Sequence, residues 1–139
     1  MATTRNARAH WEGSLFEGSG TVELTSSGIG TFPITWASRA EEANGRTSPE
    51  ELIAAAHASC FSMALSNGLA KSGNPAKSLN TSVEVDFQPG VGITEIRITL
   101  SGEAESLDAA GFAAAAEDAK ANCPVSKALA AVPITLSVV

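Results

Sequence analysis

The feature that most constrains the fold is a long apolar segment with strong helix signals at both ends. Ser48 is a preferred N-cap residue, Pro49 fits the first helical position, and Glu51 completes an S-x-x-E capping box. The apolar segment continues to about Lys71 and stops at Gly73, a residue that commonly ends helices. The sequence therefore predicts one long helix near the centre of the chain.

Strand-type segments precede and follow this helix, and glycine turns separate them. A polar segment at 37–48 predicts a loop, and Pro89-Gly90 predicts the turn of a hairpin. The expected elements are strands at 7–11, 20–24 and 30–36, the long helix, strands at 79–87 and 92–100, helices at 108–121 and from 124, and a strand at 134–139. This order predicts a single α+β domain over residues 1–139.

Composition and charge argue against several classes of protein. The 139 residues, 44% of them hydrophobic, are enough for one domain with its own core. The formal net charge of −6, with 9 Lys and Arg, argues against nucleic-acid binding. We expect no membrane span, because no apolar run approaches about 20 residues, and no secretory signal, because the N-terminus is polar. The expected location is therefore the reducing cytoplasm, where thiols persist until an oxidant reaches them.

The chain contains 2 cysteines in unlike surroundings, which indicates thiol chemistry rather than a structural disulfide. Cys60 lies in the long helix among alanines and serine, small residues that let a ligand or another backbone come close. Burial would raise the pKa of its thiol and make it an inert core residue, whereas a nearby cation would make it reactive. Arg39 is the best candidate for that cation, because a guanidinium is always charged and can hold both a thiolate and a peroxide oxygen. Taken alone, Arg39 fits a solvated loop arginine better.

Cys123 stands at the expected start of the short helix. Pro124 fits the first helical position, so Cys123 occupies the N-cap, where N–H groups and the helix dipole favour a thiolate by about 1 kcal/mol. The alternative is a capping residue that happens to be cysteine, although Ser, Asn and Asp are the usual choices there.

Two segments of the chain resemble the signatures of a known family. One runs from Ser48 to Leu65 and contains the string His57-Ala-Ser-Cys-Phe-Ser-Met-Ala-Leu, and the other is Asn122-Cys-Pro-Val-Ser-Lys127. Together they resemble the OsmC/Ohr family, the osmotically induced and organic hydroperoxide resistance proteins. The opening Ala9-His-Trp-Glu-Gly13 and the order of elements match as well, so the resemblance covers essentially the whole chain and favours the OsmC branch.

The resemblance implies a fold, an activity and a site. The implied fold is an OsmC-like α+β chain in an intertwined dimer, and the implied activity is a thiol peroxidase without haem, metal or flavin. Cys60 matches the peroxidatic cysteine, which reduces an organic hydroperoxide and becomes a sulfenic acid, and Cys123 matches the resolving cysteine that forms a disulfide with it. Arg39 matches the activating arginine, and Glu50 the glutamate that orients it. The implied reductant is a lipoyl-type dithiol, and the implied role is defence against oxidative stress.

Helix geometry adds a reason to expect a composite site. Glu51 has the spacing of the capping-box partner, which leaves Glu50 to pair with Arg39. Glu50 precedes Cys60 by ten residues on one helix, about 15 Å along the axis, so it cannot readily touch the Cys60 of its own chain. Two such helices crossing antiparallel near Ala55 would bring Glu50 of one chain beside Cys60 of the other. We therefore expect a homodimer in which each site takes Arg39 and Glu50 from one subunit and both cysteines from the other.

Several alternatives stay open beside this interpretation. His57, three residues before Cys60, is either a hydrogen-bonded core histidine or a residue that assists proton transfer to the leaving alkoxide. The same pair of cysteines would also suit a non-enzymatic member that senses redox state or binds small apolar ligands, or two buried structural thiols. A zinc site is disfavoured, because no Cys-x-x-Cys pair is present, and a hydrolase is disfavoured, because no G-x-S-x-G segment is present.

Overall fold

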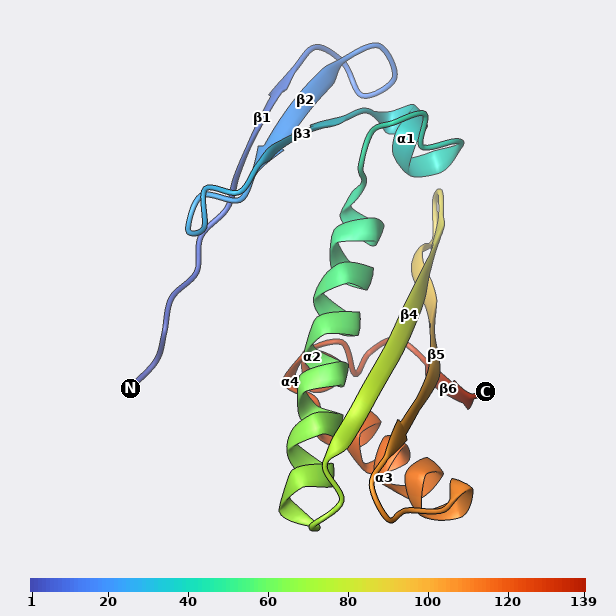
Figure 1. Ribbon diagram of the computed structural model, residues 1–139. Coiled ribbons are helices and arrows are strands. Elements are labelled where there is room, and N and C mark those ends of the chain that lie inside the picture. Colours follow the sequence, from blue (N-terminus) through green and yellow to red (C-terminus); the bar gives the residue numbers. More distant parts are fainter. The chain divides into compact units, whose positions relative to one another are not determined.

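The computed structural model describes all 139 residues, which form two compact units. The N-terminal unit comprises Met1–Glu50 and the C-terminal unit comprises Glu51–Val139. The elements of both units follow the predicted α+β order (Figure 1). The boundary lies in the first turn of the long helix, and the expectation of a single domain stays a prediction.

The N-terminal unit contains a three-stranded antiparallel sheet in the order β1-β2-β3. Its strands are β1 (Arg8–Glu12), β2 (Ser19–Glu23) and β3 (Thr31–Ile34). Each lies within a predicted strand or within one residue of it. Little of this sheet is buried, since all five residues of β1 and three of the four residues of β3 are exposed.

A short helix, α1 (Trp36–Ala40), follows β3 where the sequence predicted a loop, so that prediction is wrong. The Ser38 N–H donates to Thr35 Oγ1 and the Thr35 N–H donates to Ser38 Oγ, both at 3.1 Å, which forms a capping box. Serine takes the place of the usual Glu or Gln in that box, and the helix has only five residues, so its sequence signal is weak. The consequence is that Arg39 lies in the last turn of a helix instead of a loop.

The long helix α2 (Pro49–Lys71) begins and ends where the sequence predicts. At its end Gly73 adopts φ +82°, and the Asn74 N–H donates to the Leu69 carbonyl at 2.9 Å. By length and composition α2 could cross a membrane, because an 18-residue window reaches a mean hydropathy of 1.3. The expectation that no apolar run approaches a span is therefore wrong, since the many alanines offset the serines that interrupt the run. One such helix is weak evidence for a span, because core helices of soluble proteins pass the same test.

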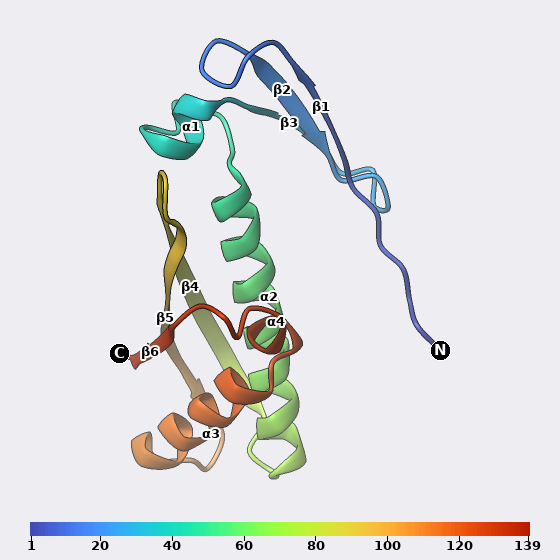
Figure 2. The same ribbon diagram turned by 180° about the vertical axis from the view of Figure 1, so that it is seen from behind.

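The C-terminal unit contains a second sheet in the order β4-β5-β6. The predicted hairpin is confirmed, and β6 adds to it in parallel after a crossover through two helices (Figures 1 and 2). The elements are β4 (Ala76–Gln88), β5 (Gly92–Ala104), α3 (Ala109–Asn122), α4 (Pro124–Ala128) and β6 (Ile134–Val138).

The core of this unit lies between α2, β5 and α3. Leucine and phenylalanine side chains on one face of α2 pack against the apolar face of β5 and against α3. The buried residues are Phe61, Leu65, Leu69, Ile98, Leu100, Phe112, Ala116, Ala119 and Cys123. Phe61, Leu65 and Leu69 follow one another at intervals of four residues along α2, so they lie on one face, as expected for a helix that buries one side.

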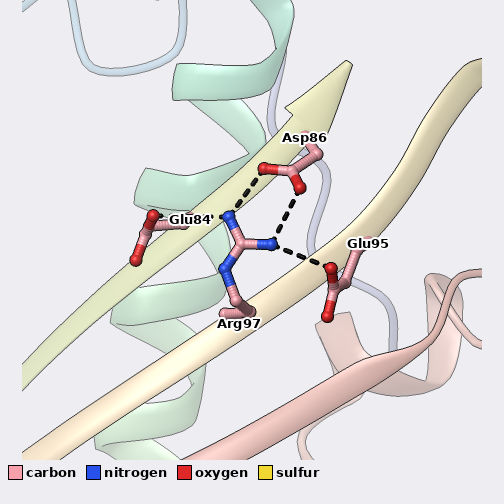
Figure 3. Close-up of polar contacts among 4 residues, drawn as sticks. All are labelled: Glu84, Asp86, Glu95 and Arg97. Atoms are coloured by element: carbon pink, nitrogen blue, oxygen red, sulfur yellow. Dashed lines mark hydrogen bonds and ion pairs between the residues drawn. The ribbon is translucent and has the colours of Figure 1, made fainter. Parts of the chain in front are cut away.

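The hairpin carries a charged cluster centred on Arg97 (Figure 3). The Arg97 guanidinium donates to both oxygens of Asp86 at 2.7 and 2.8 Å, to Glu95 at 2.9 Å and to Glu84 at 3.3 Å. These hydrogen bonds lower the pKa of Asp86 and raise that of Arg97. The cluster therefore ties β4 to β5 on a solvent-facing surface.

Candidate functional site

The two cysteines lie next to each other in the C-terminal unit, and both are reduced thiols. Cys60 is half-buried on α2 and packs against the core, whereas Cys123 is completely buried between the end of α3 and the start of α4. Their side chains lie close enough for each to shift the pKa of the other. The pair is therefore close enough for thiol–disulfide chemistry, although 63 residues separate the two in sequence.

The two thiols differ in acidity, because their surroundings differ. Burial raises the pKa of Cys60, and its hydrogen bond to Cys123 raises it further, while the Val125 backbone opposes this shift. Burial also acts to raise the pKa of Cys123, but hydrogen bonds from Cys60, from the N–H and hydroxyl of Ser126 and from Val125 outweigh it and lower the pKa. We take Cys123 as the more acidic of the two, because it occupies the predicted N-cap of α4, where N–H groups converge.

His57 is a hydrogen-bonded core histidine, one of the two interpretations that the sequence allows. Its side chain is completely buried on α2, and Nε2 lies 2.7 Å from the hydroxyl oxygen of Ser126. Burial lowers its pKa, which favours the neutral ring. Sequence reasoning did not single out Ser126, although it lies in the segment around Cys123. The sequence carries no local sign of this residue, because its contact with His57 joins positions 69 residues apart.

Arg39 and Glu50 form an ion pair in the N-terminal unit, as the spacing argument for Glu50 predicted. Arg39 Nε donates to both carboxylate oxygens of Glu50, at 3.0 and 3.2 Å, and Nη2 donates to one of them at 2.8 Å. The Glu50 side chain is only 7% exposed, and that of Arg39 is 32% exposed. The carboxylate therefore holds the Arg39 side chain in a fixed direction while part of the guanidinium stays accessible.

An apolar cavity of about 300 Å³ lies beside Arg39 in the same unit. Aromatic and aliphatic side chains form most of its wall, and the ring of Phe16 stacks edge-on against that of Trp36. The lining residues are Trp11, Leu15, Ile34, Thr35, Trp36, Arg39 and Pro49.

The structure thus brings together the members of two pairs, Cys60 with Cys123 and Arg39 with Glu50. The first pair belongs to the C-terminal unit and the second to the N-terminal unit. The assignment of all four residues to one catalytic site stays a prediction.

Comparisons with known proteins give the same family from sequence and from structure. The family model described as OsmC-like protein matches residues 42–137. Peroxiredoxin OsmC of Escherichia coli (strain K12) is 40% identical over 134 residues, which cover 94% of this chain and 93% of that protein. A crystal structure of an organic hydroperoxide resistance protein OsmC from Legionella pneumophila has a TM-score of 0.74 and 26% identity, covering 99% of this chain and 98% of the other.

The fold extends to the Ohr branch as well. The organic hydroperoxide resistance protein OhrB of Bacillus subtilis has a TM-score of 0.71 at 22% identity, covering 96% of this chain and 98% of that chain. The resemblance read from Cys60, Cys123 and their neighbouring residues is therefore confirmed. The chain belongs to the family of OsmC-like proteins.

Proposed function

We propose that this chain is a cysteine-based peroxidase that reduces organic hydroperoxides to alcohols in defence against oxidative stress. The observation that carries the proposal is the pair of neighbouring thiols, Cys60 packed against the core cluster that contains Cys123, in a chain 40% identical to a peroxiredoxin. At the level of the family, the chain is a peroxidase-type oxidoreductase that acts on peroxides.

The reaction begins with two steps on sulfur. The Cys60 thiolate attacks the terminal oxygen of the hydroperoxide, the O–O bond breaks, and the alkoxide takes a proton and leaves as an alcohol. Cys60 is then a sulfenic acid. The Cys123 thiolate attacks the Cys60 sulfur, the S–O bond breaks, and the hydroxide takes a proton and leaves as water. The contact between the two side chains supports this second step, because it needs no large movement of the backbone.

The disulfide is then reduced by a dithiol. A lipoyl-type dithiol exchanges with the Cys60–Cys123 disulfide and leaves as a cyclic disulfide, which restores both thiols. No haem, metal or flavin takes part in this sequence, because every electron moves between sulfur and oxygen or between sulfurs.

Arg39 has the role of activating Cys60, and Glu50 that of orienting Arg39. Burial raises the pKa of Cys60, so the attacking thiolate needs a cation that lowers it. The ion pair with Glu50 fixes the direction of a guanidinium that could supply this charge and also polarise the peroxide oxygens. The apolar cavity beside Arg39 supports an organic substrate over hydrogen peroxide, since it offers contact for an alkyl group.

The active form is a homodimer with composite sites, in which Arg39 and Glu50 of one subunit serve Cys60 and Cys123 of the other. One face of α2 supports this assembly, because the small residues Ala55 and Ser59 and the large side chain of Met63, 71% exposed, are all accessible in the single chain. Small residues allow two helices to approach closely, as a crossing near Ala55 requires.

We place this enzyme in the cytoplasm, as one domain. The match to the family model and the 134-residue alignment both cross the boundary between the two units, which supports a single functional domain.

Counting thiols tests the proposal, because the chain contains only 2 cysteines. One equivalent of cumene hydroperoxide should remove both thiols and yield one alcohol, and dihydrolipoamide should restore them through repeated turnovers. Cys60→Ser should abolish peroxide consumption, whereas Cys123→Ser should allow one turnover and leave a sulfenic acid open to over-oxidation. Unchanged thiols at native pH would reject the proposal. Disulfide formation without turnover in dithiol would favour a redox sensor of the same fold.

A further inference from the structure

The C-terminal unit buries two polar side chains in its apolar core, and they contact each other. His57 is completely buried and Ser126 is 6% exposed, and their side chains meet at 2.7 Å. No step of the reaction above uses either residue. A buried polar pair is costly unless its hydrogen bonds are satisfied, and an apolar pair of similar volume would avoid that cost. The pair therefore calls for an explanation beyond packing.

Ser126 connects His57 to the resolving cysteine. Cys123 precedes α4 as its N-cap residue, and Ser126 lies three positions later in the first turn. The hydroxyl and the N–H of Ser126 both act on the Cys123 thiol and lower its pKa. His57 comes from α2 and reaches the other side of the same hydroxyl. The His57 ring thus contacts the Ser126 hydroxyl, and Ser126 lies in the first turn of the helix that Cys123 caps, with all three side chains buried.

The unpaired nitrogen of His57 indicates which tautomer the ring adopts and in which direction the hydrogen bond to Ser126 runs. Nδ1 is buried and has no hydrogen-bond partner in the chain. A buried N–H without an acceptor is rarer and more costly in proteins than an acceptor without a donor. The favoured tautomer of the neutral ring therefore carries its proton on Nε2, and Nε2–H donates to the Ser126 oxygen. The hydroxyl accepts this hydrogen bond, so its own proton is available to the Cys123 sulfur.

We propose that His57 is a positioning residue for the resolving step, because it holds the Ser126 hydroxyl so that its O–H points at the Cys123 sulfur. This proposal rests on the proposed function. Ser126 then stabilises the Cys123 thiolate that attacks the Cys60 sulfenic acid. The new S–S bond forms as the S–O bond breaks, Cys123 is oxidised, Cys60 is reduced, and the hydroxide takes a proton from solvent and leaves as water. The Ser126 and His57 protons stay in place throughout.

Few titratable groups lie near Cys123, so the influence of His57 on the rate of disulfide formation should be measurable. The titratable groups among its named partners are Cys60 and, through Ser126, His57, and both come from α2. Burial keeps His57 neutral, so it acts as a fixed donor and not as a proton reservoir. Loss of this donor should leave the attack of Cys60 on peroxide unchanged and slow only the formation of the disulfide.

A single-turnover experiment without reductant tests this separation. The full-length protein is mixed with cumene hydroperoxide, and sulfenic acid and disulfide are followed by quenched-flow trapping and mass spectrometry. His57→Leu and Ser126→Ala should each slow disulfide formation about tenfold or more, as expected for losing a hydrogen bond to a charged group, and sulfenic acid should accumulate. His57→Gln, whose amide can place an N–H near the Nε2 position, should restore most of the rate. Ser78→Ala, an exposed hydroxyl on β4, is the matched control and should change neither step.

A double variant separates the chain of contacts from two independent effects. His57→Leu with Ser126→Ala should be no slower than the slower single variant, because both changes break one linkage. Multiplied effects, or a wild-type rate of disulfide formation in Ser126→Ala, would overturn the inference while leaving the proposed function intact. Equal slowing of the attack and resolving steps would also overturn it and indicate a structural role. Absence of a disulfide in the wild type would instead reject the proposed function, and this inference with it.

Discussion

Glu50 holds Arg39 through three hydrogen bonds of 2.8 to 3.2 Å while its own carboxylate is almost completely buried. The pairing makes each residue dependent on the other in a different way. Arg39 depends on Glu50 for its direction, and Glu50 depends on Arg39 for compensation of a charge that solvent barely reaches. Stability and activity should therefore respond differently when the pair is changed.

Removing only the guanidinium should cost both stability and activity. Arg39→Met leaves the Glu50 carboxylate buried without its partner, and we expect a loss of about 1–3 kcal/mol. This is less than for a fully buried pair, because Arg39 is partly exposed and solvent screens it. Peroxide reduction should fall by about 100-fold, the scale for a lost electrostatic contact to the reacting group. Urea unfolding and cumene hydroperoxide kinetics measure the two effects.

A double replacement separates the two losses. Arg39→Met with Glu50→Met should recover most of the lost stability, since no charge is left buried, but none of the activity. Arg46→Met, an exposed arginine in the connection to α2, is the matched control and should change neither quantity. Recovered activity in the double variant would show that the ion pair has no part in catalysis.

Composite sites predict that two inactive chains restore each other. In a mixed dimer of Arg39→Met and Cys60→Ser, one site combines the intact Arg39 of one chain with the intact Cys60 of the other. Random pairing of equal amounts should give about a quarter of the wild-type activity, because half of the dimers are mixed and each has one working site. Coexpression with two affinity tags isolates the mixed dimers. Peroxide kinetics on this doubly purified fraction should give about half of the wild-type activity, since every dimer in it has one working site of two.

The same mixture contains no intact site if each chain builds its site alone. An inactive mixed dimer would therefore contradict the composite arrangement, even where gel filtration shows a dimer. An active, stable monomer of the wild type would contradict the assembly itself. Either result would leave the thiol chemistry of Cys60 and Cys123 to be judged by thiol counting alone.

Elements with local signals were predictable from the sequence, and those built by distant contacts were not. The bounds of α2 follow from Pro49 and Gly73, and the hairpin from alternation around Pro89-Gly90. The pairing of Glu50 with Arg39 followed from the capping-box spacing of its neighbour. In contrast, α1 was missed because Thr35 and Ser38 form an unusual box, and the parallel pairing of β6 with β5 has no local signal. The same holds for the contact of His57 with Ser126.

The charged cluster on the hairpin should stabilise the protein in a pH-dependent way. The pKa of Asp86 lies below its ordinary value of 3.8 because of its hydrogen bonds to Arg97. Its contribution is therefore fully present above about pH 4 and is lost as the pH falls through the lowered pKa. Asp86→Asn should lower the melting temperature at pH 7, and the difference from wild type should shrink at pH 3 and in high salt. Glu105→Gln, outside the cluster, is the control. A difference that stays constant with pH would show that the ion pairs around Arg97 contribute nothing.

Buried His57 should make the protein less stable in mild acid. Its pKa in the folded state lies below the ordinary 6.5, so the unfolded chain binds a proton more readily below that pH. The contribution of neutral His57 to the free energy of unfolding is complete above about pH 6.5 and falls as the pH decreases toward the lowered pKa. The fall is at most about 1.4 kcal/mol per pH unit, which is the limit for one proton. His57→Gln should remove this component from urea unfolding measured between pH 8 and pH 5. His10→Gln should retain it, because His10 is exposed, and an unchanged pH dependence in His57→Gln would mean that the ring is not held neutral by burial.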